Sequence, residues 1–221
     1  MDFRFGFDPK TDDYKVVKLT GLTKSRKHVV KWWLQVEIYS MRKEGFRHTC
    51  MSTIIDGDYV CVDGHDGHLH WVGYNYINHN IDSQSQRILA FDLNLETFRE
   101  ILFPHSTVLD HKRDNVLEVL YGKICVMSCI TEDDACEVWV MDEYGVTELW
   151  VRRHVFSQFF GGMCLYGCTS HNEFLVKGNG CLVLYDPYAN MQRVLEDHCP
   201  EERGVDRIME YVDSLVWVAP P

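Results

Sequence analysis

The stretch FGFDPKTDDYKVV, residues 5–17, decides the fold. Two short runs of aromatic and β-branched residues flank a turn that contains Pro9 and three Asp residues. In such a turn proline fixes φ and Asp side chains accept hydrogen bonds from nearby backbone N–H groups, so the pattern predicts a β-hairpin. A strand that ends in a large residue, a turn and a second strand recur downstream, and we interpret this hairpin as part of a structural repeat.

The repeat is clearest in four alternating apolar strands, each of which ends in a large residue followed by Asp or Ser. They are residues 36–40, 89–92, 139–142 and 183–186, and each precedes a further expected strand, at 45–48, 97–101, 146–150 and 191–195. The large residues Tyr39, Phe91, Met141 and Tyr185 are 52, 50 and 44 positions apart. This spacing matches the kelch-like propeller period of about 50 residues.

Two more apolar strands precede each of these pairs, which makes the repeating unit a four-stranded antiparallel meander. In the first unit the strands are expected at about 3–8, 14–20, 32–40 and 45–49. The sequence therefore predicts an all-β, kelch-like β-propeller with about four complete four-stranded blades. A terminal hairpin at 208–212 and 214–219 follows them, so we expect the ring to be incomplete.

Composition and charge narrow the class of protein. The chain has 221 residues, 46% of them hydrophobic, and a net charge of −11, which disfavours nucleic-acid binding through phosphate neutralisation. No apolar run approaches the roughly 20 residues of a membrane span, and the N-terminus lacks a signal-peptide pattern. We expect a soluble protein of the cytoplasm or nucleus, with neither nucleic-acid nor membrane partners.

The nine cysteines support an intracellular protein, because their number is odd. Cys125, Cys164 and Cys181 lie in apolar runs, where a thiol packs as a small hydrophobic group. A secreted disulfide framework is therefore disfavoured.

An ordered series of segments covers essentially the whole chain and resembles a known family. The segments are residues 5–17, 36–46 (VEIYSMRKEGF), 88–101 (ILAFDLNLETFREI), 120–127 (LYGKICVM), 137–150 (EVWVMDEYGVTELW) and 211–216 (YVDSLV), with His70-Trp71 between them. Together they resemble the F-box-associated, kelch-like (type 1) propeller domain of plant F-box proteins, including the S-locus F-box branch of self-incompatibility. The resemblance implies a substrate receptor of an SCF-type ubiquitin ligase, whose propeller holds the protein target while its F-box docks the Skp adaptor and, through it, the cullin.

The chain departs from that family at its start. Family members carry an F-box and a further propeller segment before the Phe-Gly-Phe-Asp hairpin, and residues 1–221 contain neither. We therefore expect residues 1–221 to form a partial F-box-associated domain that does not bind the adaptor by itself. The alternative is a stand-alone kelch-like interaction scaffold, or a truncated paralogue, without a ubiquitin-ligase link.

Loop lengths predict a binding face. In a four-stranded meander alternate connections lie at opposite edges. One set is short, whereas the other contains residues 21–31, 51–58, 74–87, 105–115, 157–162 and 197–206. Long loops without secondary structure often carry function, so we expect this long-loop face to bind the partner, although tolerated surface insertions would look the same.

Basic and aromatic residues are the candidate contacts on that face, since Arg and Lys pair with carboxylate or phosphate and aromatic rings supply contact area. A solvated turn followed by a strand with one Trp in the core explains the cluster at 24–32 better, and the same ambiguity applies to the other clusters. The candidates are Lys24, Arg26, Lys27, His28, Trp32, His105, His111, Arg113, Arg152 and Arg153.

Catalytic signals are weak. His68 and His70 share one side of an expected strand and could present two imidazoles to a metal, but spacing identifies no third ligand. No nucleophile-elbow, zinc-protease or phosphate-loop pattern occurs. We predict a non-catalytic protein without a cofactor, in which residues such as Trp71, Phe91 and Trp150 fill the space between blades.

Overall fold

The computed structural model describes residues 2–26, 29–51, 61–76, 84–104, 113–130, 135–157, 164–178 and 181–196, and almost all of them form strands. The strands make four antiparallel sheets of four strands each, in chain order. Sheet 1 contains β1 (Asp2–Asp8), β2 (Asp13–Arg26), β3 (Val29–Ser40) and β4 (Gly45–Met51). Sheet 2 contains β5 (Cys61–His65), β6 (His68–Tyr76), β7 (Gln84–Asp92) and β8 (Thr97–Leu102).

Sheets 3 and 4 repeat the same meander. Sheet 3 contains β9 (Arg113–Leu120), β10 (Lys123–Ile130), β11 (Ala135–Met141) and β12 (Trp150–Ser157), with a short 3-10 helix, η3 (Thr147–Leu149), before β12. Sheet 4 contains β13 (Cys164–Cys168), β14 (Phe174–Gly178), β15 (Cys181–Asp186) and β16 (Met191–Glu196). The prediction of four four-stranded units is confirmed, whereas the terminal hairpin at 208–219 lies outside the described residues.

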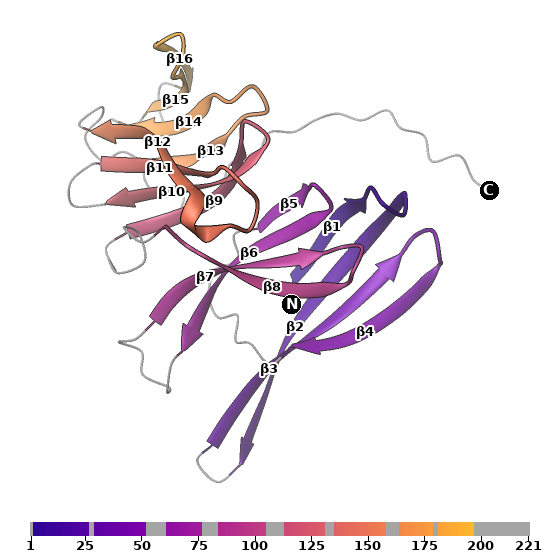
Figure 1. The fold of residues 1–221 in the computed structure, drawn as a ribbon. Helices are drawn as coiled ribbons and strands as arrows, with labels where there is room; N and C mark the ends of the chain where they lie inside the picture. Colours follow the sequence, from indigo (N-terminus) through magenta and orange to yellow (C-terminus); the bar gives the residue numbers. More distant parts are fainter. Residues whose placement is uncertain are drawn as a thin grey trace.

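The sheets follow one another as the blades of a propeller do. The first strand of each sheet contacts the first strand of the next, so that β1 meets β5, β5 meets β9 and β9 meets β13. Figure 1 shows the sheets following one another in chain order, and β4, β8, β12 and β16 are the edge strands opposite the first strands. The four described sheets do not close into a ring.

The apolar core lies mainly between neighbouring sheets. Trp71 and Phe91 of sheet 2 pack against Val17 and Ile38 of sheet 1, and all four are at most 2% exposed. Two further clusters join sheet 2 to sheet 3 and sheet 3 to sheet 4. Trp71, Phe91 and Trp150 are buried as predicted.

A buried lysine ties sheet 1 to sheet 2. The Lys15 ammonium lies 3.4 Å from the Asp8 carboxylate and 3.2 Å from Glu96, and it donates a hydrogen bond to the Leu93 carbonyl. The side chains of Lys15 and Asp8 are 3% and 1% exposed. Asp8 also accepts hydrogen bonds from Thr11 and from the Lys10 amide.

The Asp or Ser that ends the third strand of most sheets has a structural role. Its side-chain oxygen accepts a hydrogen bond from a backbone N–H group in the turn that follows, which fixes a four-residue connection to the last strand. These contacts are Ser40 Oγ with Lys43 N at 3.0 Å, Asp92 Oδ1 with Asn94 N at 2.8 Å, and Asp186 Oδ1 with Tyr188 N at 2.8 Å.

Several predicted boundaries were wrong. Residues 74–76 and 84–87, expected as loop, belong to β6 and β7, and residues 113–115, also expected as loop, belong to β9. Residues 21–31, expected as a long loop, continue the β2–β3 ladder to the pair Arg26 and Val29, and the paired ends project beyond β1 and β4 in Figure 1. The β-branched and aromatic residues at 29–33 favour a strand there. The strand expected at 146–150 begins only at Trp150, because residues 147–149 form η3.

One covalent feature was not predicted. Cys129 and Cys136 form a disulfide between directly paired positions of β10 and β11. Cys125 lies on the same strand, two residues before Met127 and on the same face. It is a buried free thiol, as its apolar surroundings predicted.

Candidate functional site

The turn between the first two strands differs in sheet 3. In sheets 1, 2 and 4 the left-handed residue of this turn, apart from glycine, is Asp12, Asp66 or Asn172, with φ of 51°, 47° and 64°. Asp and Asn tolerate that conformation because their short side chains bond locally. Sheet 3 places Tyr121 there, at φ 54°, although a bulky side chain at positive φ is strained.

The connection between the last two strands also differs in sheet 3. It spans residues 142–149, whereas the corresponding connections of the other sheets are 41–44, 93–96 and 187–190. Asp142 occupies the position of the turn-capping residues, yet its Oδ1 accepts from two side chains. These are Lys123 Nζ at 3.0 Å and Arg153 Nη2 at 2.9 Å.

A β-bulge in β12 aims two consecutive side chains in one direction. Val138 pairs with His154 and Trp139 with Arg152, so that Arg153 is the extra residue. In a regular strand, neighbours point to opposite faces, whereas a bulge re-aims one of them. Arg153 and His154 consequently line the same pocket.

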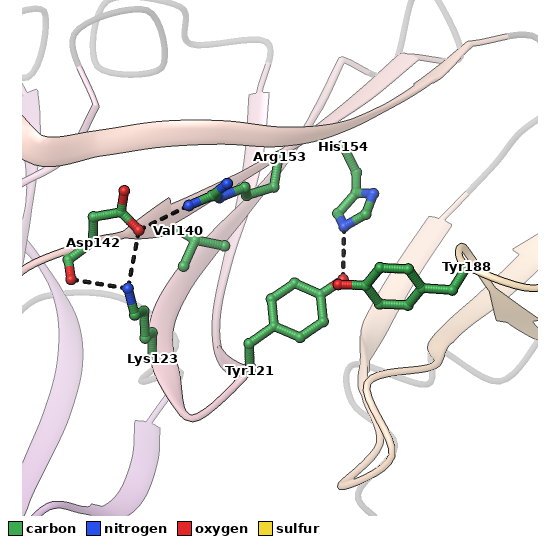
Figure 2. Close-up of a pocket in the computed structure, with 7 residues that line it drawn as sticks. All are labelled: Tyr121, Lys123, Val140, Asp142, Arg153, His154 and Tyr188. Atoms are coloured by element: carbon green, nitrogen blue, oxygen red, sulfur yellow. Dashed lines mark hydrogen bonds and ion pairs between the residues drawn. The ribbon is translucent and has the colours of Figure 1, made fainter.

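These departures from the repeat meet in one pocket, of about 310 Å³. Figure 2 shows its seven lining residues: Tyr121, Lys123, Val140, Asp142, Arg153, His154 and Tyr188. Six come from sheet 3, and Tyr188 comes from the β15–β16 turn of sheet 4. Tyr121, Asp142 and Tyr188 are turn residues, so the pocket opens at the edge that carries the short turns. We call it the turn-edge pocket.

One side of the turn-edge pocket is aromatic. Tyr121 and His154 Nε2 are hydrogen bonded at 2.9 Å, and the ring of Tyr188 meets that of Tyr121 edge-on at 5.8 Å. The Tyr121 N–H group donates to Asn172 Oδ1 at 2.7 Å, which anchors this turn to sheet 4. Tyr188 itself is 78% exposed.

The protonation states of this pair follow from its surroundings. Burial, followed by hydrogen bonding to Tyr188, raises the pKa of Tyr121 far above its usual range. Burial, followed by the charge of Arg153, lowers the pKa of His154. At neutral pH both groups are uncharged, and the tautomer of His154 decides which of the two donates the hydrogen bond between them.

The other side of the pocket is ionic. Hydrogen bonds from Lys123 and then Arg153 lower the pKa of Asp142, so this carboxylate stays ionised at neutral pH. The three side chains are 43%, 46% and 35% exposed, in the order Lys123, Arg153, Asp142. Two cations thus share one carboxylate at the rim of the pocket.

A second pocket, of about 470 Å³, lies on the other side of Lys123 and Asp142. Asp66 of sheet 2 and Tyr144 also line it. The Tyr144 hydroxyl is 2.7 Å from His70 Nε2, and its ring packs under the Arg99 guanidinium at 4.3 Å. The turn edge therefore offers hollows on both sides of sheet 3.

The predicted contact residues do not assemble into one described site. Lys24 and Arg26 lie in β2, Trp32 in β3 and Arg113 at the start of β9, where only the backbone is described; Lys27, His28, His105 and His111 lie outside the described residues. Arg152 and Arg153 were expected beside a long loop but belong to β12, where Arg152 pairs with Glu137 at 2.7 Å. The long-loop face therefore stays a prediction.

Sequence reasoning missed Tyr121, Lys123, Asp142 and Tyr188. A comparison between the repeats contains a signal for the first of them, since Tyr121 stands where the other turns have Asp or Asn. Within the described ranges, no three His, Cys, Asp or Glu residues gather as metal ligands, and His68 instead contacts Asp92 at 3.5 Å. Nor does that part of the chain contain a helix long and apolar enough to cross a membrane.

Comparison with known proteins identifies the family. The F-box-associated β-propeller domain matches residues 1–203. The chain belongs to this family. This F-box-associated domain is 26% identical to the F-box protein CPR1 of Arabidopsis thaliana over 97% of the chain and 55% of that protein. It is also 26% identical to an F-box/kelch-repeat protein of the same plant, over 77% of the chain and 49% of the relative. The chain thus spans about half the length of the curated relatives it matches.

Proposed function

We propose that this domain is the substrate-recognition part of an SCF-type E3 ubiquitin ligase receptor and that it has no catalytic role of its own. Family membership and the two F-box relatives support a role in recognising proteins for such receptors. Adaptor and cullin contacts would be made by an F-box outside residues 1–221. We also propose that the protein acts in the cytoplasm or nucleus.

The turn-edge pocket is the observation that carries this proposal. Its volume of about 310 Å³ is at the lower end for ligand sites, and its open ionic rim and exposed Tyr188 suit a side chain of a partner protein. Its titratable pair is poorly suited to acid–base chemistry, because Tyr121 stays protonated and His154 Nε2 is already engaged. Binding is therefore the role that this geometry favours.

Co-precipitation with the Skp adaptor tests the ubiquitin-ligase link. The tagged full-length product of the gene should bring down adaptor and cullin, whereas residues 1–221 alone should bring down neither. A target protein that co-precipitates with both the full-length product and residues 1–221 should become ubiquitinated only when the full-length product is present. A full-length product that retains this protein but no adaptor would support the interaction scaffold and overturn the ligase assignment.

A further inference from the structure

The turn-edge pocket contains an unequal set of charges. Lys123 and Arg153 both bind Oδ1 of Asp142, and Lys123 also donates to the Asp142 carbonyl at 3.0 Å. Asp186, whose charge also reaches Tyr121, accepts from the Tyr188 and Ala189 amides at 2.8 and 3.0 Å. The lining residues thus contribute two positive charges and one negative charge, within a protein whose net charge is −11.

Arg153 is the cation best placed to accept a second anion. A guanidinium has five N–H donors in a planar fork, and the contact with Asp142 is made by Nη2. The bulge turns this fork toward the pocket beside the Tyr121–His154 pair. An added carboxylate could form a bidentate pair with Arg153 while Lys123 keeps its contact with Asp142.

We propose that the turn-edge pocket binds the carboxylate side chain of an Asp or Glu residue in a protein partner, with Arg153 as its principal ligand and Tyr188 packing against the adjoining segment. This inference rests on the proposed function, because it names the chemical class of target that the domain recognises. One carboxylate balances the charges of the lining residues. A phosphoryl group, with a charge of about −1.5 to −2, exceeds that balance.

Titration of the whole chain with matched tripeptides tests the proposal. The probes are acetyl-Ala-Glu-Ala-amide, the Gln analogue and the phosphoserine analogue, and the readout is the NMR shifts of Tyr188 and His154. The Glu probe should shift both residues and saturate, whereas the Gln probe should leave them unmoved. Equal shifts with Gln, or tighter binding of phosphoserine, would overturn the assignment to carboxylate.

The chain supplies a matched control for Arg153. Arg152 is the adjacent residue, is similarly exposed at 52% against 46%, and also holds a carboxylate, but it does not line the pocket. Because hydrogen bonds to charged groups are strong, Arg153→Gln should weaken the Glu probe about tenfold or more while Arg152→Gln leaves it unchanged. Equal effects of the two variants would reduce the binding to general charge attraction and sink the proposal.

The two proposals fail in different ways. A full-length product that binds the Skp adaptor, together with a Glu probe that does not bind, would refute the pocket assignment alone. Specific Glu binding that depends on Arg153, together with a full-length product that binds no adaptor, would refute the ligase link and leave the pocket as a recognition site of a scaffold.

Discussion

Replacement of Lys15 by Met should destabilise the domain by about 3 kcal/mol, because removal of one partner of a buried ion pair leaves the other charge uncompensated. The charge left uncompensated is the carboxylate of Asp8, whose side chain is only 1% exposed. Glu96 is affected less because Arg47 also binds it, at 3.2 Å. Thr11 and the Lys10 amide still bond to Asp8, which places the cost at the lower end of the range of about 3–5 kcal/mol.

Lys18 on the same strand provides the control. It pairs with Glu37, but the two side chains are 29% and 19% exposed, so Lys18→Met should cost much less than Lys15→Met. Urea unfolding followed by tryptophan fluorescence measures both costs. In a chain of this length, about 3 kcal/mol corresponds to a fall in Tm of roughly 6–12 °C.

A second substitution tests the cause. Asp8→Asn in the Lys15→Met background removes the uncompensated charge and should recover much of the lost stability, which gives the pair a coupling free energy of about 2 kcal/mol. Two results would show that the buried Asp8 charge is not the cause. Lys15→Met would lower the free energy of unfolding no more than Lys18→Met, or the effects of Asp8→Asn and Lys15→Met on that free energy would be additive.

Acid titration gives an independent check on Asp8. Burial acts to raise the pKa of Asp8, but hydrogen bonds from Thr11, Lys10 and Asn94 and the charge of Lys15 together lower it below 3.8. A lowered pKa stabilises the folded state above the unfolded value, and that stabilisation is lost as the pH falls through the folded pKa. The Lys15→Met variant should lose less stability over this acid range than the wild type.

Three further predictions concern other parts of the molecule. Because burial and then Arg153 lower the pKa of His154 from 6.5, the free energy of unfolding should decrease as the pH falls below that value, and less so in His154→Gln; equal slopes would contradict this. Cys129→Ala should cost about 2–3 kcal/mol by opening a loop of seven residues, and dithiothreitol should destabilise the wild type but not the variant. Phe46, 69% exposed on the aromatic outer face of sheet 1, should promote self-association, so that Phe46→Lys lowers the sedimentation coefficient at high concentration; a wild type that stays monomeric there would refute this.

The repeat made the fold predictable from sequence. Alternating strands that end in Asp or Ser recur at a propeller-like period, and the structure explains why: Ser40, Asp92 and Asp186 each cap the turn that follows. At these positions the capping of the turn and the repeat of the strands therefore specify the same fold. The limits of single strands were harder to predict. Polar residues near 24–27 look like a loop, although the hairpin ladder includes Lys24 and Arg26.

The turn-edge pocket was out of reach for a different reason. Its residues belong to two sheets, and Tyr188 meets Tyr121 only after the sheets have packed. The β-bulge that aims Arg153 has no local marker in the sequence, because consecutive arginines in a strand normally point to opposite faces. The deviation at Tyr121 could have been noticed by comparing the four turns with one another.

Photo-crosslinking tests the central claim, that this propeller holds its protein target at the turn edge. A benzoylphenylalanine placed at position 188 of the full-length product should crosslink in plant cells to a protein that also becomes ubiquitinated, and Arg153→Gln should greatly reduce that crosslink. The same probe at Tyr14, an exposed aromatic residue of sheet 1, serves as the control. Crosslinking of the ubiquitinated target from position 14 but not from position 188 would show that the target does not bind at the turn edge.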